Sequence, residues 1–225
     1  MTQTTLLQTP SPLQLAERAA LRDDPLRFGV GARLTIAVMS DRYADIILGA
    51  LAAADTADLI VETGDVSTFL GGDETALLRC LTDVTSAIAG TRAHASISIL
   101  LSRGCPGEVE CALPGGAGPR AVEPPTGRDT GRYASAEWAL YPLADEVTAG
   151  VEPDHMRDIH AAIDLSKDNG TFRGSAHFVT RLEGDAGRIL ETVVAGWTLV
   201  GRSVQHVTSH LTLSLNSPSH AHVDA

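Results

Sequence analysis

The stretch Thr68-Phe69-Leu70-Gly71-Gly72-Asp73 returns 112 positions later as Thr180-Arg181-Leu182-Glu183-Gly184-Asp185. In both places a short strand-like run meets a glycine and then an aspartate, a combination typical of a turn followed by a helix cap. The register holds without a gap from Tyr43 to Pro106. Further identities at this shift are Ala50 with Ala162, Leu78 with Leu190, His94 with His206, Ser102 with Ser214, and Pro106 with Pro218. One register over so long a span indicates an internal duplication.

The first strand of each copy keeps a different register. Leu34-Thr35-Ile36-Ala37-Val38-Met39 matches Trp138-Ala139-Leu140-Tyr141-Pro142-Leu143 at a shift of 104. The difference between the two shifts predicts an eight-residue insertion in the second copy, at Glu146 to Pro153.

Each copy is expected to form a strand, a helix, two strands, a second helix and a final strand. In the first copy we expect strands at 33–39, 59–63, 66–70 and 94–101, and helices at 42–54 and 73–88. Asp73 and Asp185 are placed to cap the second helix of their copies. The pattern predicts an α+β fold, a tandem duplication of a ferredoxin-like βαββαβ (ACT-like) unit. Such units have antiparallel sheets with helices on one face, so a second copy or a second subunit is expected to cover the other face.

Composition shifts along the chain predict its division into parts. The expected parts are an N-terminal tail at 1–30, a first ferredoxin-like domain at 31–106, a Pro/Gly-rich linker at 107–131, a second domain at 132–220 and a C-terminal tail at 221–225. Within the N-terminal tail, Ser11 followed by Pro12 predicts the start of one short helix.

Charge and composition exclude several classes of partner. The formal net charge of −11 repels phosphate backbones and anionic lipid, so no nucleic-acid partner is expected. No window approaches the roughly 20 apolar residues of a membrane helix, and Met1 to Pro10 does not resemble a signal peptide. The three cysteines, Cys80, Cys105 and Cys111, suit a reducing compartment. We therefore expect a cytoplasmic protein without membrane insertion.

The final strand of each copy alternates between apolar and polar residues. In the second copy, Leu211, Leu213 and Leu215 alternate with His210, Thr212 and Ser214. One face of the sheet therefore carries hydroxyls and imidazoles. These side chains either form a solvated sheet face or line a polar pocket between two sheets.

No sequence motif indicates catalysis or a metal site. His206 and His210 share a strand face about 13 Å apart, too far to bind one ion together. Asp65 and His177 occupy equivalent turns of the two copies. A turn carboxylate is usually solvated, although Asp65 could also balance a cationic ligand.

Several segments together resemble the YkoF-type hydroxymethylpyrimidine (HMP)/thiamine-binding family. In the first copy they are Ile46-Ile47-Leu48-Gly49-Ala50-Leu51-Ala52-Ala53-Ala54-Asp55-Thr56, Asp65-Val66-Ser67-Thr68, and Ser102 with Gly104-Cys105-Pro106-Gly107. In the second copy they are Ala139-Leu140-Tyr141-Pro142-Leu143, Gly170-Thr171-Phe172, Gly184-Asp185 and Asn216-Ser217-Pro218-Ser219. The resemblance covers about residues 28–220. It implies non-enzymatic binding of thiamine or HMP, one site per domain, in a homodimer that serves precursor salvage near an import system.

The resemblance also implies which residues contact the ligand. Carried over by position, they are Ile36 and Thr68 in the first copy, and Leu140 and Thr180 in the second. An aminopyrimidine is flat and has a donor–acceptor edge, which a strand backbone and a threonine hydroxyl can pair with. No other cofactor is expected.

The two copies do not match the family equally well. The first copy has Ala37-Val38 where the second keeps Tyr141-Pro142, so the first site is expected to depart further from the family's. No basic phosphate cradle is present, so unphosphorylated ligands are expected to bind better than diphosphates. Two alternatives stay open: a module that senses a small molecule and regulates a partner, and an enzyme that uses Asp65, His177 and His210.

Overall fold

The structure, a computed structural model, describes residues 11–105, 117–143 and 155–220. Its helices are α1 Pro12–Asp23, α2 Pro25–Phe28, α3 Tyr43–Ala53, α4 Glu74–Gly90, α5 His155–Asp168, α6 Ala186–Val200 and the 3-10 helix η2 Pro218–His220. Its strands are β1 Gly31–Val38, β2 Ile60–Thr63, β3 Thr68–Gly71, β4 Ala95–Arg103, β5 Tyr133–Leu143, β6 Phe172–Ala176, β7 Val179–Asp185 and β8 His206–Leu215. None of these helices combines the length and apolar character needed to cross a membrane.

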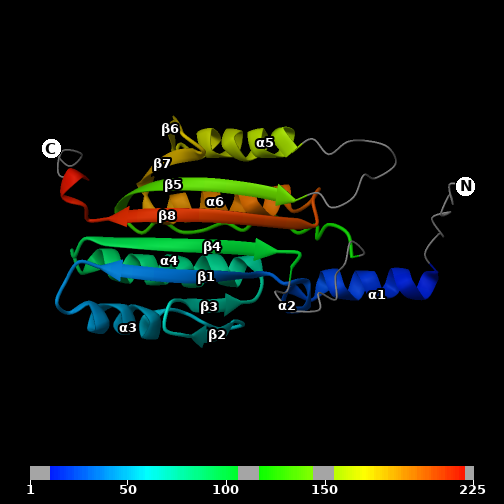
Figure 1. Ribbon diagram of the computed structural model, residues 1–225, viewed down its shortest axis with the longest axis horizontal. Coiled ribbons are helices and arrows are strands. Elements are labelled where there is room, and N and C mark those ends of the chain that lie inside the picture. The colour runs from blue at the N-terminus through cyan, green and yellow to red at the C-terminus, as the bar shows by residue number, and fades with distance from the viewer. Residues whose placement is uncertain (1–10, 106–116, 144–154, 221–225) are drawn as a thin grey trace, which may run out of the picture.

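All eight strands form one antiparallel sheet in the order β2-β3-β1-β4-β8-β5-β7-β6 (Figure 1). The first four strands of this order belong to the first copy and the last four to the second. Helices α3, α4, α6 and α5 pack against one another in that order and form a layer along the sheet. The core lies between the two layers, where Ile97, Leu213 and Trp197 are fully buried.

Strand pairing confirms the duplication and both of its registers. Thr35 of β1 pairs with Ser98 of β4, and Ala139 of β5 pairs with His210 of β8. The first residues of these pairs differ by 104 positions and the second residues by 112, the shifts that the sequence shows. The chain is therefore a tandem repeat of one βαββαβ unit.

The predicted helix caps are present. Asp73 accepts hydrogen bonds from the backbone amides of Thr75 and Ala76, both at 2.8 Å, and thereby begins α4. Asp185 likewise accepts from the amides of Gly187 and Arg188 at the start of α6. Ser11 caps α1 as expected.

The arrangement of the two copies differs from the expected pair of sheets. The second copy extends the sheet of the first through β4 and β8 and does not cover its free face. Edge pairing satisfies backbone groups that would otherwise be left open at the end of each unit's sheet. As a result, Ser98, His210 and Thr212 lie on the open face of one sheet, whereas Ser209 points into the buried interior. No pocket between two sheets exists in the described chain.

Residues 24–30 contribute more than the predicted tail. Asp24 caps α2, and Gly29 ends it in the left-handed conformation with a φ of 77°. This turn places Phe28 in the core, where it is fully buried below the guanidinium of Arg103. The aspartate, proline and glycine that bound α2 are recognisable helix signals, but only the fold shows where Phe28 packs.

The described part of the predicted linker, residues 117–131, packs along the helices. Arg120 reaches Glu74 of α4, and Thr130 donates to Asp185 at the start of α6. The linker therefore ties the two units together on the helical side.

Candidate ligand-binding site

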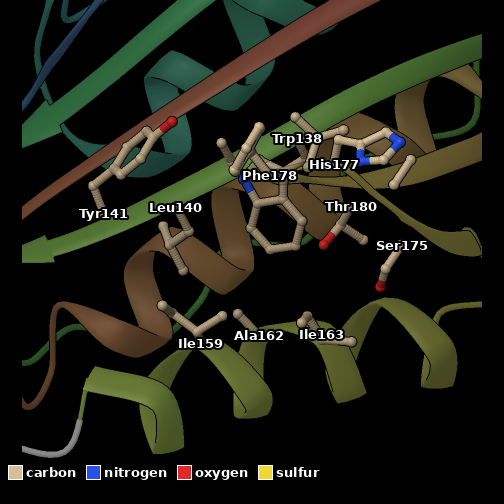
Figure 2. Close-up of a pocket in the computed structure, with 13 residues that line it drawn as sticks. Trp138, Leu140, Tyr141, Ile159, Ala162, Ile163, Ser175, His177, Phe178 and Thr180 are labelled. Atoms are coloured by element: carbon tan, nitrogen blue, oxygen red, sulfur yellow. The ribbon is translucent and has the colours of Figure 1, made fainter.

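A cavity of about 580 Å³ lies between α5 and the second copy's half of the sheet (Figure 2). Trp138, Leu140 and Thr180 line it from β5 and β7. Ile159, Ala162 and Ile163 line it from α5, and the hairpin 175–179 borders it. The volume is in the range of small-molecule sites.

Strand and helix periodicity places these side chains. Trp138 and Leu140 are two residues apart in β5 and therefore point to the same face of the sheet. Thr180 of β7 pairs directly with Trp138. On α5, Ile159 and Ile163 are four residues apart, one turn of the helix, and so face the sheet together.

The indole of Trp138 is fixed by its neighbours. Its Nε1 donates to Ser209 Oγ at 2.8 Å in the buried interior. A Cβ atom on Gly196 of α6 would lie 2.8 Å from the Cη2 atom of the indole. Glycine at position 196 is therefore what leaves room for the ring beside α6.

The lining is mainly apolar, with few polar groups. Thr180, Ser175 and His177 supply hydroxyls and an imidazole, and none of the lining residues is lysine, arginine, aspartate or glutamate. Figure 2 shows the hydroxyls of Thr180 and Ser175 directed toward α5. Such a cavity suits a flat, partly polar ring and offers no ionic partner for a phosphate.

The predicted contact residues of the second copy, Leu140 and Thr180, meet in this cavity. Their role in binding stays a prediction. Ile36 and Thr68 occupy the equivalent positions beside α3, where Thr68 pairs with Leu34. The hydroxyls of Thr68 and Thr63 lie 3.2 Å apart and form a hydrogen bond.

Tyr141 borders the cavity, but its ring does not form a wall of it. Figure 2 shows its ring directed away from the side of β5 on which Leu140 lies, and the residue is 51% exposed. Strand alternation requires this, because neighbouring residues point to opposite faces. The aromatic residue that distinguishes this site is Trp138. The repeat aligns Trp138 with Leu34, so this difference between the two copies is visible in the sequence.

The three titratable candidates for catalysis do not converge. Asp65 lies in the turn between β2 and β3, and His177 in the turn between β6 and β7, at opposite edges of the eight-stranded sheet. His210 lies on the open face, where its Nε2 is 3.0 Å from Ser98 Oγ. Within the described ranges, no three metal-ligating side chains are grouped closely enough to hold an ion.

The fold and the cavity define a class of protein: a tandem ferredoxin-like α+β chain with a cavity between helix and sheet. The model of the YKOF-related family matches residues 29–108 and 133–220, one match for each copy, and the chain belongs to this family. It is 29% identical over 189 residues to YkoF of Bacillus subtilis (strain 168), which bears the provisional name of an HMP/thiamine-binding protein. The alignment covers 84% of this chain and 91% of that protein.

Proposed function

We propose that this chain binds thiamine or its HMP moiety and does not transform it. The observation that carries the proposal is the cavity of about 580 Å³ in which Leu140 and Thr180 meet. The name of the Bacillus subtilis relative supports the same class of ligand.

The chemistry of the lining fits an aminopyrimidine. The flat ring would lie against Trp138 and Leu140, while its polar edge pairs with the Thr180 hydroxyl and nearby backbone groups. Because none of the lining residues is lysine or arginine, a diphosphate would enter without a permanently charged cationic partner. We therefore propose that unphosphorylated ligands bind more tightly.

A second site, formed by Ile36 and Thr68, follows from the duplication, and it is the weaker of the two. The Thr68 hydroxyl is already hydrogen-bonded to Thr63, whereas no described residue makes a hydrogen bond to the Thr180 hydroxyl. A ligand at the first site would have to compete with that bond.

A binding role is favoured over an enzymatic one because Asp65, His177 and His210 lie too far apart to act on one substrate. A regulatory module that reports ligand binding to a partner protein is the second candidate. Such a partner would use the open sheet face, so this candidate competes for the surface that is proposed next for a second subunit.

We also propose that the protein acts in the cytoplasm in salvage or transport of thiamine precursors, as a homodimer. The open sheet face offers a surface for the second subunit: Leu100 there is 41% exposed and pairs with His210 beside the centre of the sheet. Sedimentation of the wild type should give a dimer, and Leu100→Glu should give monomers. A monomeric wild type would exclude the dimer.

Calorimetric titration of the full chain with thiamine, HMP and thiamine diphosphate tests the proposed function. We expect the first two to bind and the diphosphate to bind more weakly. The proposed function is wrong if neither thiamine nor HMP binds with a dissociation constant below about 1 mM, which corresponds to a binding free energy of about −4 kcal/mol. Mass spectrometry of the ligands after incubation should show no conversion, and a new product would instead indicate an enzyme.

A further inference from the structure

Phe178 stands at the tip of the hairpin between β6 and β7, beside the cavity (Figure 2). It borders the cavity, yet 98% of its surface is exposed. Its backbone adopts the left-handed conformation, with a φ of 72°. The residue therefore combines an exposed aromatic ring with a backbone conformation that favours glycine.

Neither property stabilises the fold, and the backbone conformation costs free energy. A bulky residue with positive φ is an outlier, and such strain costs about 1–3 kcal/mol. The ring recovers almost nothing by burial, since it packs against almost none of the protein. A two-residue hairpin turn of this kind ordinarily places glycine or asparagine at the left-handed position. Folding alone thus gives no reason for phenylalanine here.

The equivalent hairpin of the first copy lacks this combination. Its tip carries Val66 at the position of Phe178, and Val66 is not among the residues with positive φ. Val66 is also exposed, at 81%, so exposure is common to both tips. Of the two hairpins, the one beside the cavity that holds Trp138 carries the strained aromatic residue.

We propose that Phe178 is an aromatic cap of this cavity, which closes over the face of a flat heteroaromatic ring and selects for that class of ligand. This inference rests on the proposed function of the site. Thr180 would bind the edge of the ring, while Phe178 covers its face and buries its own surface in doing so. Stacking and loss of water-exposed apolar area then repay the strain only when a ring is bound.

The cap is tested on the full chain by titration with thiamine, followed by tryptophan fluorescence. The chain has two tryptophans: Trp138 lines the cavity and Trp197 is fully buried in the core, so a change on binding reports this site. Phe178→Ala should weaken binding about fivefold to tenfold, the effect of one aromatic contact. Val66→Ala, the matched control in the other hairpin, should leave this titration unchanged.

Phe178→Gly separates a binding role from a structural one. This variant should weaken thiamine binding to the same extent as Phe178→Ala. It should also raise the midpoint of thermal unfolding by about 2 °C, because glycine relieves the strain. A merely structural residue would not weaken binding while the fold becomes more stable. If the wild type binds thiamine and both Phe178 variants bind equally well, the cap is wrong and the proposed function stands. If the wild type binds neither thiamine nor HMP, both proposals fail.

Discussion

Ile99 and Leu211 lie directly opposite each other across the junction of β4 and β8, and the 112-residue shift converts one into the other. The pairs on either side exchange in the same way: Ser98 with Thr212 corresponds to His210 with Leu100. A local two-fold axis therefore passes between Ile99 and Leu211. The chain has the geometry of a symmetric dimer of single units that share one sheet, joined into one polypeptide.

This symmetry lets each proposed contact be tested against its own counterpart. Thr180→Val should weaken thiamine binding about fivefold, because the ligand loses one hydrogen bond worth about 1 kcal/mol. Thr68→Val should have less than about half that effect on affinity, since the Thr68 hydroxyl is already bonded to Thr63. Calorimetry of both variants measures the ranking, and equal losses would refute it.

Asp185 and Asp73 offer a second comparison between equivalent positions. Both cap a helix, but Asp185 also accepts hydrogen bonds from Thr130 in the linker and from the amide of Arg132, which directly follows the linker. Asp73→Ala should cost about 1 kcal/mol of unfolding free energy, the usual value of a cap, and Asp185→Ala about 2 kcal/mol. Urea unfolding measures both, and an equal cost would mean that the linker bonds contribute nothing.

The contribution of Asp185 should depend on pH. Burial acts to raise the pKa of this carboxyl, but hydrogen bonds from Thr130 and Gly187 outweigh it and hold the pKa below its ordinary value. A depressed carboxyl pKa stabilises the fold above about pH 4 and loses that contribution as pH falls through the folded-state pKa. The stability difference between wild type and Asp185→Asn should therefore shrink in acid. A difference that is constant from pH 7 to pH 3 would contradict this.

Glu74 holds two arginines in the interior. Its Oε1 lies 3.2 Å from Arg103, which is fully buried, and 3.4 Å from Arg120. Burial lowers the pKa of Arg103 to about 10, while Glu74 acts in the opposite direction. Glu74→Gln leaves both guanidinium groups without their carboxylate and should cost about 3–5 kcal/mol.

The exposed pair of Arg42 and Asp45 is the control for this buried cluster. Asp45→Asn should change the unfolding free energy by less than about 1 kcal/mol, because water screens the pair. Chemical denaturation of both variants measures the two changes in unfolding free energy. Similar costs at Glu74 and Asp45 would show that the buried cluster is not held by its charges.

The parts of the fold that were predictable from the sequence depend on local patterns. The caps at Asp73 and Asp185, the strand alternation around His210 and the two repeat shifts all appear within short segments. The pairing of β4 with β8 was not predictable in this way, because an edge strand has the same residues whether it pairs with a neighbour or stays free. The burial of Arg103 also depends on distant partners, since α2, α6 and the linker all meet around it.

The candidate site shows the same division. Leu140 and Thr180 could be carried over by position, and the structure places them in one cavity. Phe178 belongs to no sequence motif, because its importance depends on a backbone angle and an exposed fraction that only the fold supplies. Trp138 was identifiable from the sequence, because it is one of several positions whose side chains differ in size between the two copies.

Three such positions change as a set. Trp138, Gly196 and Ser209 meet in the second copy, where the indole contacts the glycine and donates to the serine. Their equivalents in the first copy are three buried aliphatic residues, Leu34, Val84 and Ile97. A large ring beside a glycine, with a hydroxyl for its N–H, thus replaces three aliphatic side chains of intermediate size.

This exchange predicts strong non-additivity. Gly196→Val alone should force the indole aside and cost about 2 kcal/mol, and Trp138→Leu alone should leave a void and a buried, unpaired Ser209 hydroxyl at a cost of about 3 kcal/mol. The triple variant Trp138→Leu, Gly196→Val, Ser209→Ile reproduces the packing of the first copy and should be more stable than either single variant. Urea unfolding of the set measures the coupling. If the free-energy costs of the single substitutions add up in the triple variant, the three positions are independent. The space for Trp138 beside the cavity then did not arise from coordinated substitutions at Gly196 and Ser209.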